Sequence, residues 1–218
     1  MPLHQDRDAV GFILAGGQSS RMGGDKALVP FAGQPLVERA LGILRQAGLP
    51  AAVAGARLPL TASAPVIPDR KPALGPLGGI CAALASTSAQ RAVFLPVDLP
   101  LLPASLVAYL LAHARITGRA VTVPSVNGFA ETFPVVLDRA VLPALEAELN
   151  AMRGGCFAAF QAAAAGLGEA VTVVPVELLV QSGGVAHPDA LPALRWFLNV
   201  NTPEDLLRAE RCVPARFA

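Results

Sequence analysis

The sequence predicts an α/β fold: one Rossmann-like, doubly wound domain over residues 1–218, with a mostly parallel sheet and helices on both faces. Short apolar runs of strand length alternate with stretches of helical length and pattern. The chain has 218 residues, of which 53% are hydrophobic and only 15% are charged. This composition is typical of a sheet that is buried between two layers of helices.

The first predicted strand, residues 10–14, is a continuous apolar run that stops at a pair of glycines. A polar connection over residues 16–31 follows it. The next element is a helix over residues 36–47, because Pro35 suits the start of a helix, an apolar stripe follows, and Gly48 is a common terminator. Further along, the same patterns predict strands over residues 51–54, 65–67 and 92–95, and helices over residues 80–85 and 103–114.

The second half of the chain continues this alternation. Thr202, Pro203 and Asp205 suit the N-cap, first and third positions of a last helix over residues 203–211. The stretch 176–194 is the least regular and is expected to form an excursion at one end of the sheet. The remaining predicted elements are strands over residues 120–123, 133–137 and 171–174, and helices over residues 141–149 and 157–165.

Charge and cysteine usage argue against several classes of protein. A formal net charge of +1 does not indicate a nucleic-acid-binding surface or a basic membrane anchor. No apolar run approaches the roughly 18 residues of a membrane-spanning helix, and charged residues near the start argue against a signal peptide. The three cysteines are widely spaced, so neither a disulfide framework nor a zinc site is expected, and a cytoplasmic location is predicted.

Polar loops follow three of the predicted strands, after Leu14, Ile67 and Leu95. In open α/β sheets, ligands bind beyond the carboxyl ends of the parallel strands. We therefore expect these loops to meet at one edge of the sheet and to form the binding site.

The loop after Leu14 reads AGGQSSRMGGDK and carries the strongest chemical signal. Gly16 and Gly17 let the backbone approach a phosphate chain closely. Arg21 and Lys26 bring two positive charges, which can neutralise a transferring phosphoryl group. The motif is not a Walker A loop, in which the lysine precedes serine or threonine at the start of a helix. An ordinary surface loop is the alternative, but the motif favours phosphate binding.

Asp98 is a single carboxylate within an apolar run, just after the predicted strand over residues 92–95. A carboxylate at the end of a buried strand is costly unless a cation or strong donors compensate it. Magnesium typically uses one or two carboxylates, with phosphates and water completing its octahedron. Asp98 is therefore a candidate Mg²⁺ ligand. The alternative is an aspartate that accepts backbone N–H bonds in the turn that follows.

Three further features belong to the expected site, each with a simpler alternative. Asp69 follows the strand over residues 65–67 and could be a turn residue. The glycine-rich turn around Gly78 would let a base or ribose lie against a helix N-terminus, or would form a tight loop. Asn199 and Asn201 precede the last helix, where asparagines are also common as turn or cap residues.

Together these motifs resemble the molybdenum cofactor guanylyltransferase family, in that family's order and over nearly the whole chain. The first and last blocks are the specific ones. The matching residues are 14–17 (LAGG), 21–26 (RMGGDK), 69 (Asp), 75–79 (GPLGG), 98–100 (DLP) and 199–206 (NVNTPEDL).

The resemblance implies a nucleotidyltransferase that uses GTP and Mg²⁺ and acts on the terminal phosphate of molybdopterin bearing molybdenum. Lys26, Arg21 and Asp98 would be catalytic, through positioning and charge neutralisation. Asp98 would hold the metal, and Asn199 and Asn201 would face the acceptor. The implied nucleotide-binding residues are Leu14, Ala15, Gly16, Gly17, Lys26, Asp69, Gly78 and Asp98. Transient contact with molybdoenzymes or other proteins of cofactor biosynthesis would follow from such a role.

Three stretches depart from the family's pattern. Ala54 and Gly55 stand where relatives often carry asparagine, residues 131–134 lack a Gln-Pro or His-Pro pair, and the stretch 176–194 is longer than usual. Relatives that use CTP tend to read LAAG, so the LAGG of this chain favours GTP. The alternatives are a transferase of the same fold that uses CTP or a sugar-phosphate acceptor, and a non-catalytic nucleotide-binding protein.

Overall fold

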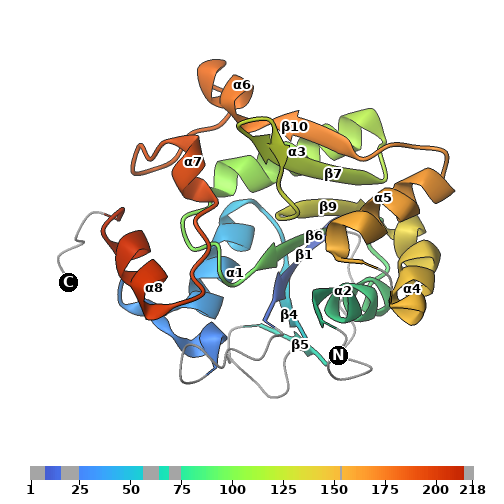
Figure 1. The fold of residues 1–218 in the computed structure, drawn as a ribbon, viewed down its shortest axis with the longest axis horizontal. Coiled ribbons are helices and arrows are strands. Elements are labelled where there is room, and N and C mark those ends of the chain that lie inside the picture. Colours follow the sequence, from blue (N-terminus) through green and yellow to red (C-terminus); the bar gives the residue numbers. More distant parts are fainter. Residues whose placement is uncertain (1–7, 16–24, 56–63, 69–74, 153, 214–218) are drawn as a thin grey trace.

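The structure is a computed structural model of the chain, and it describes residues 8–15, 25–55, 64–68, 75–152 and 154–213. A mixed sheet crosses the middle of the molecule, with helices on both of its sides (Figure 1). The predicted Rossmann-like α/β fold with a mostly parallel sheet is confirmed.

The sheet strands follow the order β10-β7-β9-β6-β1-β4-β5, and β8 pairs with β7. Neighbouring strands are parallel from β6 to β5 and between β10 and β7, whereas β9 is antiparallel to both β6 and β7. The strands are β1 (Ala9–Leu14), β4 (Ala51–Ala54), β5 (Val66–Ile67), β6 (Arg91–Pro96), β7 (Val121–Val126), β8 (Phe129–Ala130), β9 (Val135–Asp138) and β10 (Thr172–Pro175), and a separate hairpin is formed by β2 (Pro30–Phe31) and β3 (Gln34–Pro35).

The helices are α1 (Leu36–Gln46), α2 (Gly75–Ser86), α3 (Ala104–Thr117), α4 (Leu142–Ala151), α5 (Cys156–Gly166), α6 (Val176–Gln181), α7 (Ala193–Trp196) and α8 (Pro203–Glu210), with 3-10 turns η1 (Lys26–Leu28) and η2 (Arg139–Val141). The stretch 176–194 was predicted to be irregular, but it contains α6 and the start of α7. Within the described ranges, no helix combines the length and hydrophobicity needed to cross a lipid bilayer.

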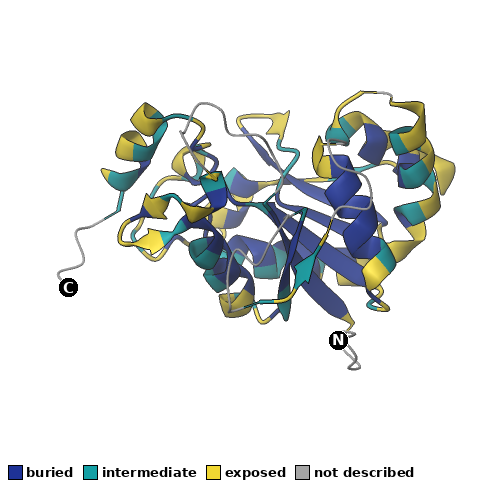
Figure 2. Ribbon diagram, turned by 90° about the horizontal axis from the view of Figure 1, so that it is seen from below, coloured by how far each residue is buried: buried dark blue, intermediate teal, exposed yellow. Residues whose placement is uncertain are grey.

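Each face of the sheet has its own hydrophobic core, because successive side chains of a strand point to opposite faces. On β1, Ile13 belongs to the core that includes α1 and α3. Phe12 and Leu14 belong to the core that includes α2, α4 and α5. Figure 2 shows the central strands almost entirely buried, with the exposed residues on the outer sides of the helices. The helical layers on both faces confirm the doubly wound arrangement.

The hairpin of β7 and β8 was not predicted from the sequence. Asn127 and Gly128 adopt φ values of 52° and 80° and form the turn between the two strands. An Asn-Gly pair between apolar residues is a strong hairpin signal, so β8 could have been predicted. After this reversal the chain continues into β9, which enters the sheet antiparallel to its neighbours.

The helix predicted over residues 80–85 begins earlier, at Gly75, so the predicted glycine-rich turn is the first part of α2. Pro76 is tolerated there because the first N–H groups of a helix make no intrahelical bonds. Gly78 and Gly79 are buried, and α2 packs on β1, β4 and β5. This packing outweighs the low helix propensity of glycine.

Candidate active site

The carboxyl ends of β1 and β6 lie side by side, where the order of strands in the sheet reverses. From β1 the chain adds β4 and β5 on one side, and it then returns to add β6 on the other. The Val97 N–H donates to the Leu14 carbonyl at 3.2 Å, so the backbones of β1 and β6 stay paired to the residue just after β6. In open α/β sheets, ligands bind at such a switch point.

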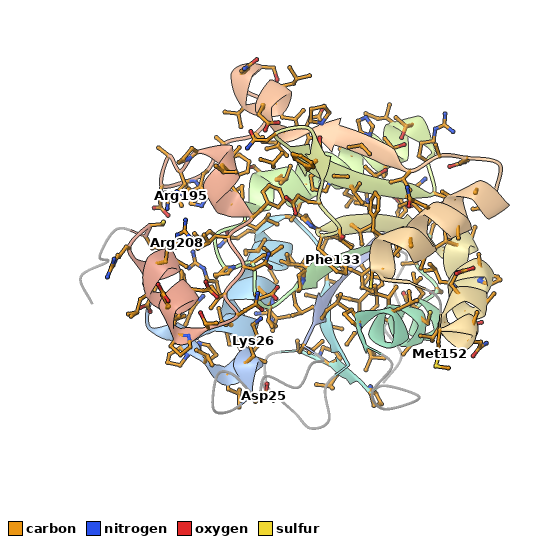
Figure 3. The ribbon with its side chains drawn as sticks, in the orientation of Figure 1. Asp25, Lys26, Phe133, Met152, Arg195 and Arg208 are labelled. Carbon is orange, nitrogen blue, oxygen red and sulfur yellow. The ribbon has the colours of Figure 1, made fainter. Side chains whose placement is uncertain are left out.

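Lys26, Asp98 and Asn201 meet at this edge of the sheet. Lys26 Nζ donates to Asp98 Oδ2 at 2.9 Å and to Asn201 Oδ1 at 2.7 Å. Figure 3 shows Lys26 beside the segment that leads into α8. The side chains of Lys26 and Asp98 are 15% and 22% exposed, so the ion pair is partly buried but still reachable by a ligand.

Asp25 fixes the backbone that carries Lys26. Its Oδ1 accepts from the Ala27 N–H at 3.0 Å and caps the short turn η1. Ala27 itself is fully buried. The main chain on both sides of Lys26 is therefore anchored, and its long side chain reaches across to Asp98.

The two carboxylate oxygens of Asp98 have different surroundings. Oδ2 accepts from Lys26, whereas Oδ1 is buried and has no hydrogen-bond partner among the described residues. A buried carboxylate oxygen without a donor is costly, and a divalent cation would compensate it. No three or more His, Cys, Asp or Glu side chains gather within the described ranges. The unpartnered Oδ1 of Asp98 fits a cation such as Mg²⁺, which takes one or two carboxylates and obtains its other ligands from phosphates and water.

Three contacts hold the loop that follows Asp98. The Asp98 carbonyl accepts from the Val200 N–H at 2.9 Å. The Pro100 carbonyl accepts from Arg39 Nε, and the next carbonyl along the chain accepts from His187 Nε2 at 3.1 Å. Arg39 and His187 were not predicted from the sequence, because neither residue lies in a recognisable motif and both act over a long sequence separation.

His187 is neutral in this arrangement. Its Nδ1 accepts from the Asp189 N–H at 3.0 Å. The hydrogen must then be on Nε2, which donates to the Leu101 carbonyl. Burial lowers the pKa of His187 from its ordinary value, Arg39 acts in the same direction, and Asp189 and the Leu101 carbonyl oppose the shift.

Acidification is expected to destabilise the protein through His187. Between the lowered pKa and the ordinary value of about 6.5, the unfolded chain binds more protons than the folded chain. The free energy of unfolding therefore falls as the pH falls through this range. Thermal unfolding of the wild type and of the non-titrating variant His187→Gln, measured from about pH 8 to about pH 5, should show their stability difference shrinking. A difference that stays constant over this range would contradict the prediction.

Four other predicted site residues lie within the described ranges: Leu14, Ala15, Gly78 and Asn199. Leu14 and Ala15 already use backbone groups in the sheet, because the Leu14 carbonyl accepts from Val97 and the Ala15 N–H donates to the Ala54 carbonyl at 3.1 Å. Their predicted backbone contacts with a nucleotide stay predictions. Gly78 is buried near the start of α2, and Asn199 is exposed. The predicted roles of Gly16, Gly17, Arg21 and Asp69 fall outside the described residues and stay predictions.

Glu131 lies in the stretch that lacks the Gln-Pro or His-Pro pair. Its N–H donates to the Pro124 carbonyl at 2.9 Å, so the chain remains paired with β7 for one residue beyond β8. Because β6 and β7 are both antiparallel to β9, the β7–β8 hairpin stands at the same edge of the sheet as Asp98. Burial raises the pKa of Glu131 from its ordinary value.

Comparison with known proteins assigns the chain to a family. The sequence profile of the MobA-like NTP transferase domain matches residues 11–166. A molybdenum cofactor guanylyltransferase from Rhodobacter capsulatus is 36% identical over 213 residues, which cover 92% of this chain and 94% of that protein. The chain belongs to the MobA-like molybdenum cofactor guanylyltransferase family. It is accordingly a nucleotidyltransferase, as the sequence motifs predicted.

Solved structures show how widely the fold of this guanylyltransferase family member is shared. Molybdopterin-guanine dinucleotide biosynthesis protein A from Archaeoglobus fulgidus aligns with a TM-score of 0.72 and 22% identity, over 92% of this chain and 96% of that one. A Mycobacterium tuberculosis protein in complex with manganese aligns with a TM-score of 0.61 and 18% identity, over 94% of this chain and 99% of that one. At these identities the likeness shows a shared fold.

Proposed function

We propose that this chain transfers GMP from GTP to the terminal phosphate of molybdopterin and releases pyrophosphate, with Mg²⁺ held by Asp98. The observation that carries the proposal is the contact between Lys26 and Asp98 just beyond β1 and β6, where α/β sheets bind their ligands. The name of the Rhodobacter capsulatus relative supports a guanine nucleotide and a molybdenum cofactor precursor as the substrates.

The reaction is an in-line displacement at the α-phosphorus of GTP. A phosphate oxygen of the acceptor forms a new P–O bond as the bond to the oxygen that bridges to the β-phosphorus breaks. Pyrophosphate leaves with that electron pair. The attacking phosphate is already ionised at neutral pH, so the step requires no general base from the protein.

The residues of this chain would act by orienting the triphosphate and neutralising its charge. Lys26 would turn from Asp98 toward the phosphates, and Arg21 would add a second positive charge from the glycine-rich loop. When bound, Mg²⁺ would neutralise further charge on the phosphates and restrict their orientation. Asp98 would be its protein ligand.

The nucleotide and the acceptor would lie on different sides of Lys26. Asn201 already contacts Lys26 Nζ, so an acceptor bound by Asn199 and Asn201 would place its phosphate beside the transferring group. Asp69 and Gly78 would contact the nucleotide. Transient contact with molybdoenzymes or other cofactor-biosynthesis proteins, and a cytoplasmic location, are part of the same proposal.

A substrate panel tests the proposed function. The purified protein is incubated with Mg²⁺ and with GTP, CTP or ATP, each alone, with molybdopterin or with a sugar phosphate, and pyrophosphate is measured. Release that requires both GTP and molybdopterin is expected. Release with CTP, or with a sugar phosphate in place of molybdopterin, would identify the alternative transferases. A protein that binds a nucleotide but releases no pyrophosphate with any pair would be non-catalytic.

A further inference from the structure

Asp205 connects the last helix to the candidate active site. Its Oδ2 accepts from the Asn201 N–H at 3.1 Å, from the Thr202 N–H at 2.9 Å and from the Thr202 hydroxyl at 2.8 Å. The side chain of Asn201 in turn accepts from Lys26 Nζ at 2.7 Å. A carboxylate in the first turn of α8 therefore fixes the backbone of a residue whose side chain contacts the phosphate-binding lysine.

We propose that Asp205 is a positioning residue for nucleotidyl transfer, which holds Asn201 so that its amide faces Lys26 and the acceptor. This inference rests on the proposed function and deepens it. Asp205 itself would touch neither substrate, and its effect would pass through Asn201.

Helix capping alone does not account for the contacts of Asp205. In the capping box, the Thr202 hydroxyl accepts from the Asp205 N–H at 3.1 Å, and the Asp205 carboxylate accepts from the Thr202 N–H. These two bonds are the ones that stabilise the start of α8. The bond from the Asn201 N–H is additional, because Asn201 precedes the N-cap residue. It ties the helix to the site.

The surroundings of Asn201 make this tie effective. On its other side, the Val200 N–H donates to the Asp98 carbonyl at 2.9 Å, and Val200 is fully buried. Asn201 thus lies between two anchored positions. The Thr202 hydroxyl, and after it the Asn201 N–H, hold the pKa of Asp205 below its ordinary value. The carboxylate is therefore charged at neutral pH, and a charged acceptor makes the stronger hydrogen bond.

The far end of α8 is also attached near the site. Glu210 Oε1 accepts from the Ala32 N–H, in the turn between β2 and β3, at 3.1 Å. The hairpin of β2 and β3 follows directly after η1, which carries Lys26. Because Glu210 still attaches the far end of α8 to this hairpin, removing the Asp205 carboxylate should release Asn201 while α8 stays in place.

The test compares two variants that each break the capping box. Thr202→Ala removes the hydroxyl but leaves the bonds from the Asn201 and Thr202 N–H groups to Asp205, whereas Asp205→Ala removes the carboxylate that accepts from both N–H groups and from the hydroxyl. Asp205→Ala is expected to raise the KM for molybdopterin on the order of tenfold and to change the KM for GTP little. Thr202→Ala is expected to keep a KM for molybdopterin near the wild-type value, although both variants should melt at lower temperature.

Two further measurements separate positioning from loss of the fold. Asp205→Asn keeps an oxygen that can accept from the same N–H groups, so it should restore most of the wild-type KM for molybdopterin. Hydrogen exchange at the Asn201 amide, which needs no turnover, should be faster in Asp205→Ala than in Thr202→Ala.

The outcomes distinguish this inference from the proposed function. If both alanine variants raise the KM for molybdopterin equally, or expose the Asn201 amide equally, capping accounts for Asp205 and the inference is overturned. If the wild type releases no pyrophosphate, the proposed function is overturned, and this role for Asp205 with it.

Discussion

Asp98→Ala is expected to lower pyrophosphate release from GTP on the order of a thousandfold. The substitution removes the carboxylate proposed to hold Mg²⁺ and takes from Lys26 a partner at 2.9 Å. Asp98 follows β6 and belongs to neither hydrophobic core, so the fold should remain intact. Turnover and thermal unfolding, measured on the same preparation, check both parts of the prediction.

Asp98→Asn separates the charge of this side chain from its shape. Asparagine keeps the size and an oxygen that can accept from Lys26, but it lacks the negative charge that a divalent cation requires. We expect it to be nearly as inactive as the alanine variant. Binding of Mn²⁺ as a spectroscopic probe, followed by electron paramagnetic resonance, should be lost in both. Normal turnover in Asp98→Asn would contradict the assignment of Asp98 as a metal ligand.

Lys26→Met is expected to lose most turnover, on the order of a hundredfold or more. Methionine keeps an unbranched apolar side chain but lacks the ammonium group. The variant therefore loses the charge that would neutralise the triphosphate, and it loses the hydrogen bonds to Asp98 and to Asn201. GTP binding, measured by calorimetry, should weaken as well. Lys26→Arg is the matched control, because it keeps the charge but changes its geometry, and it should retain part of the activity.

Lys26→Met and Asp98→Asn should change metal binding in opposite directions. The ammonium of Lys26 and a divalent cation compete for the same carboxylate, since Nζ lies 2.9 Å from Asp98 Oδ2. Without nucleotide, Mn²⁺ should therefore bind Lys26→Met more tightly than the wild type, and it should not bind Asp98→Asn. Weaker Mn²⁺ binding in Lys26→Met would contradict this competition.

Most elements of the fold were predictable because their signals are local. Thr202, Pro203 and Asp205 predicted the start of α8, and the structure contains the full capping box. The direction of β9 was not predictable in this way. An apolar run can form a strand in either direction, and the reversal at the Asn127-Gly128 turn, which was not predicted, makes β9 antiparallel to β6 and β7.

For the candidate site, the sequence by itself determined which chemical groups are available: an ammonium at Lys26, a carboxylate at Asp98 and an amide at Asn201. It also predicted that the loops bearing Lys26 and Asp98 meet at one edge of the sheet. Only the tertiary structure showed that Lys26 directly contacts Asp98 and Asn201, from which it is 72 and 175 positions away. Only the tertiary structure showed that Arg39 and His187 hold the loop after Asp98. The physical reason is that a residue's charge comes from its own side chain, and its backbone preference comes from its type and its neighbours in the sequence. Its distant partners, in contrast, depend on the order of strands in the sheet. That order depends on the packing of both hydrophobic cores at once.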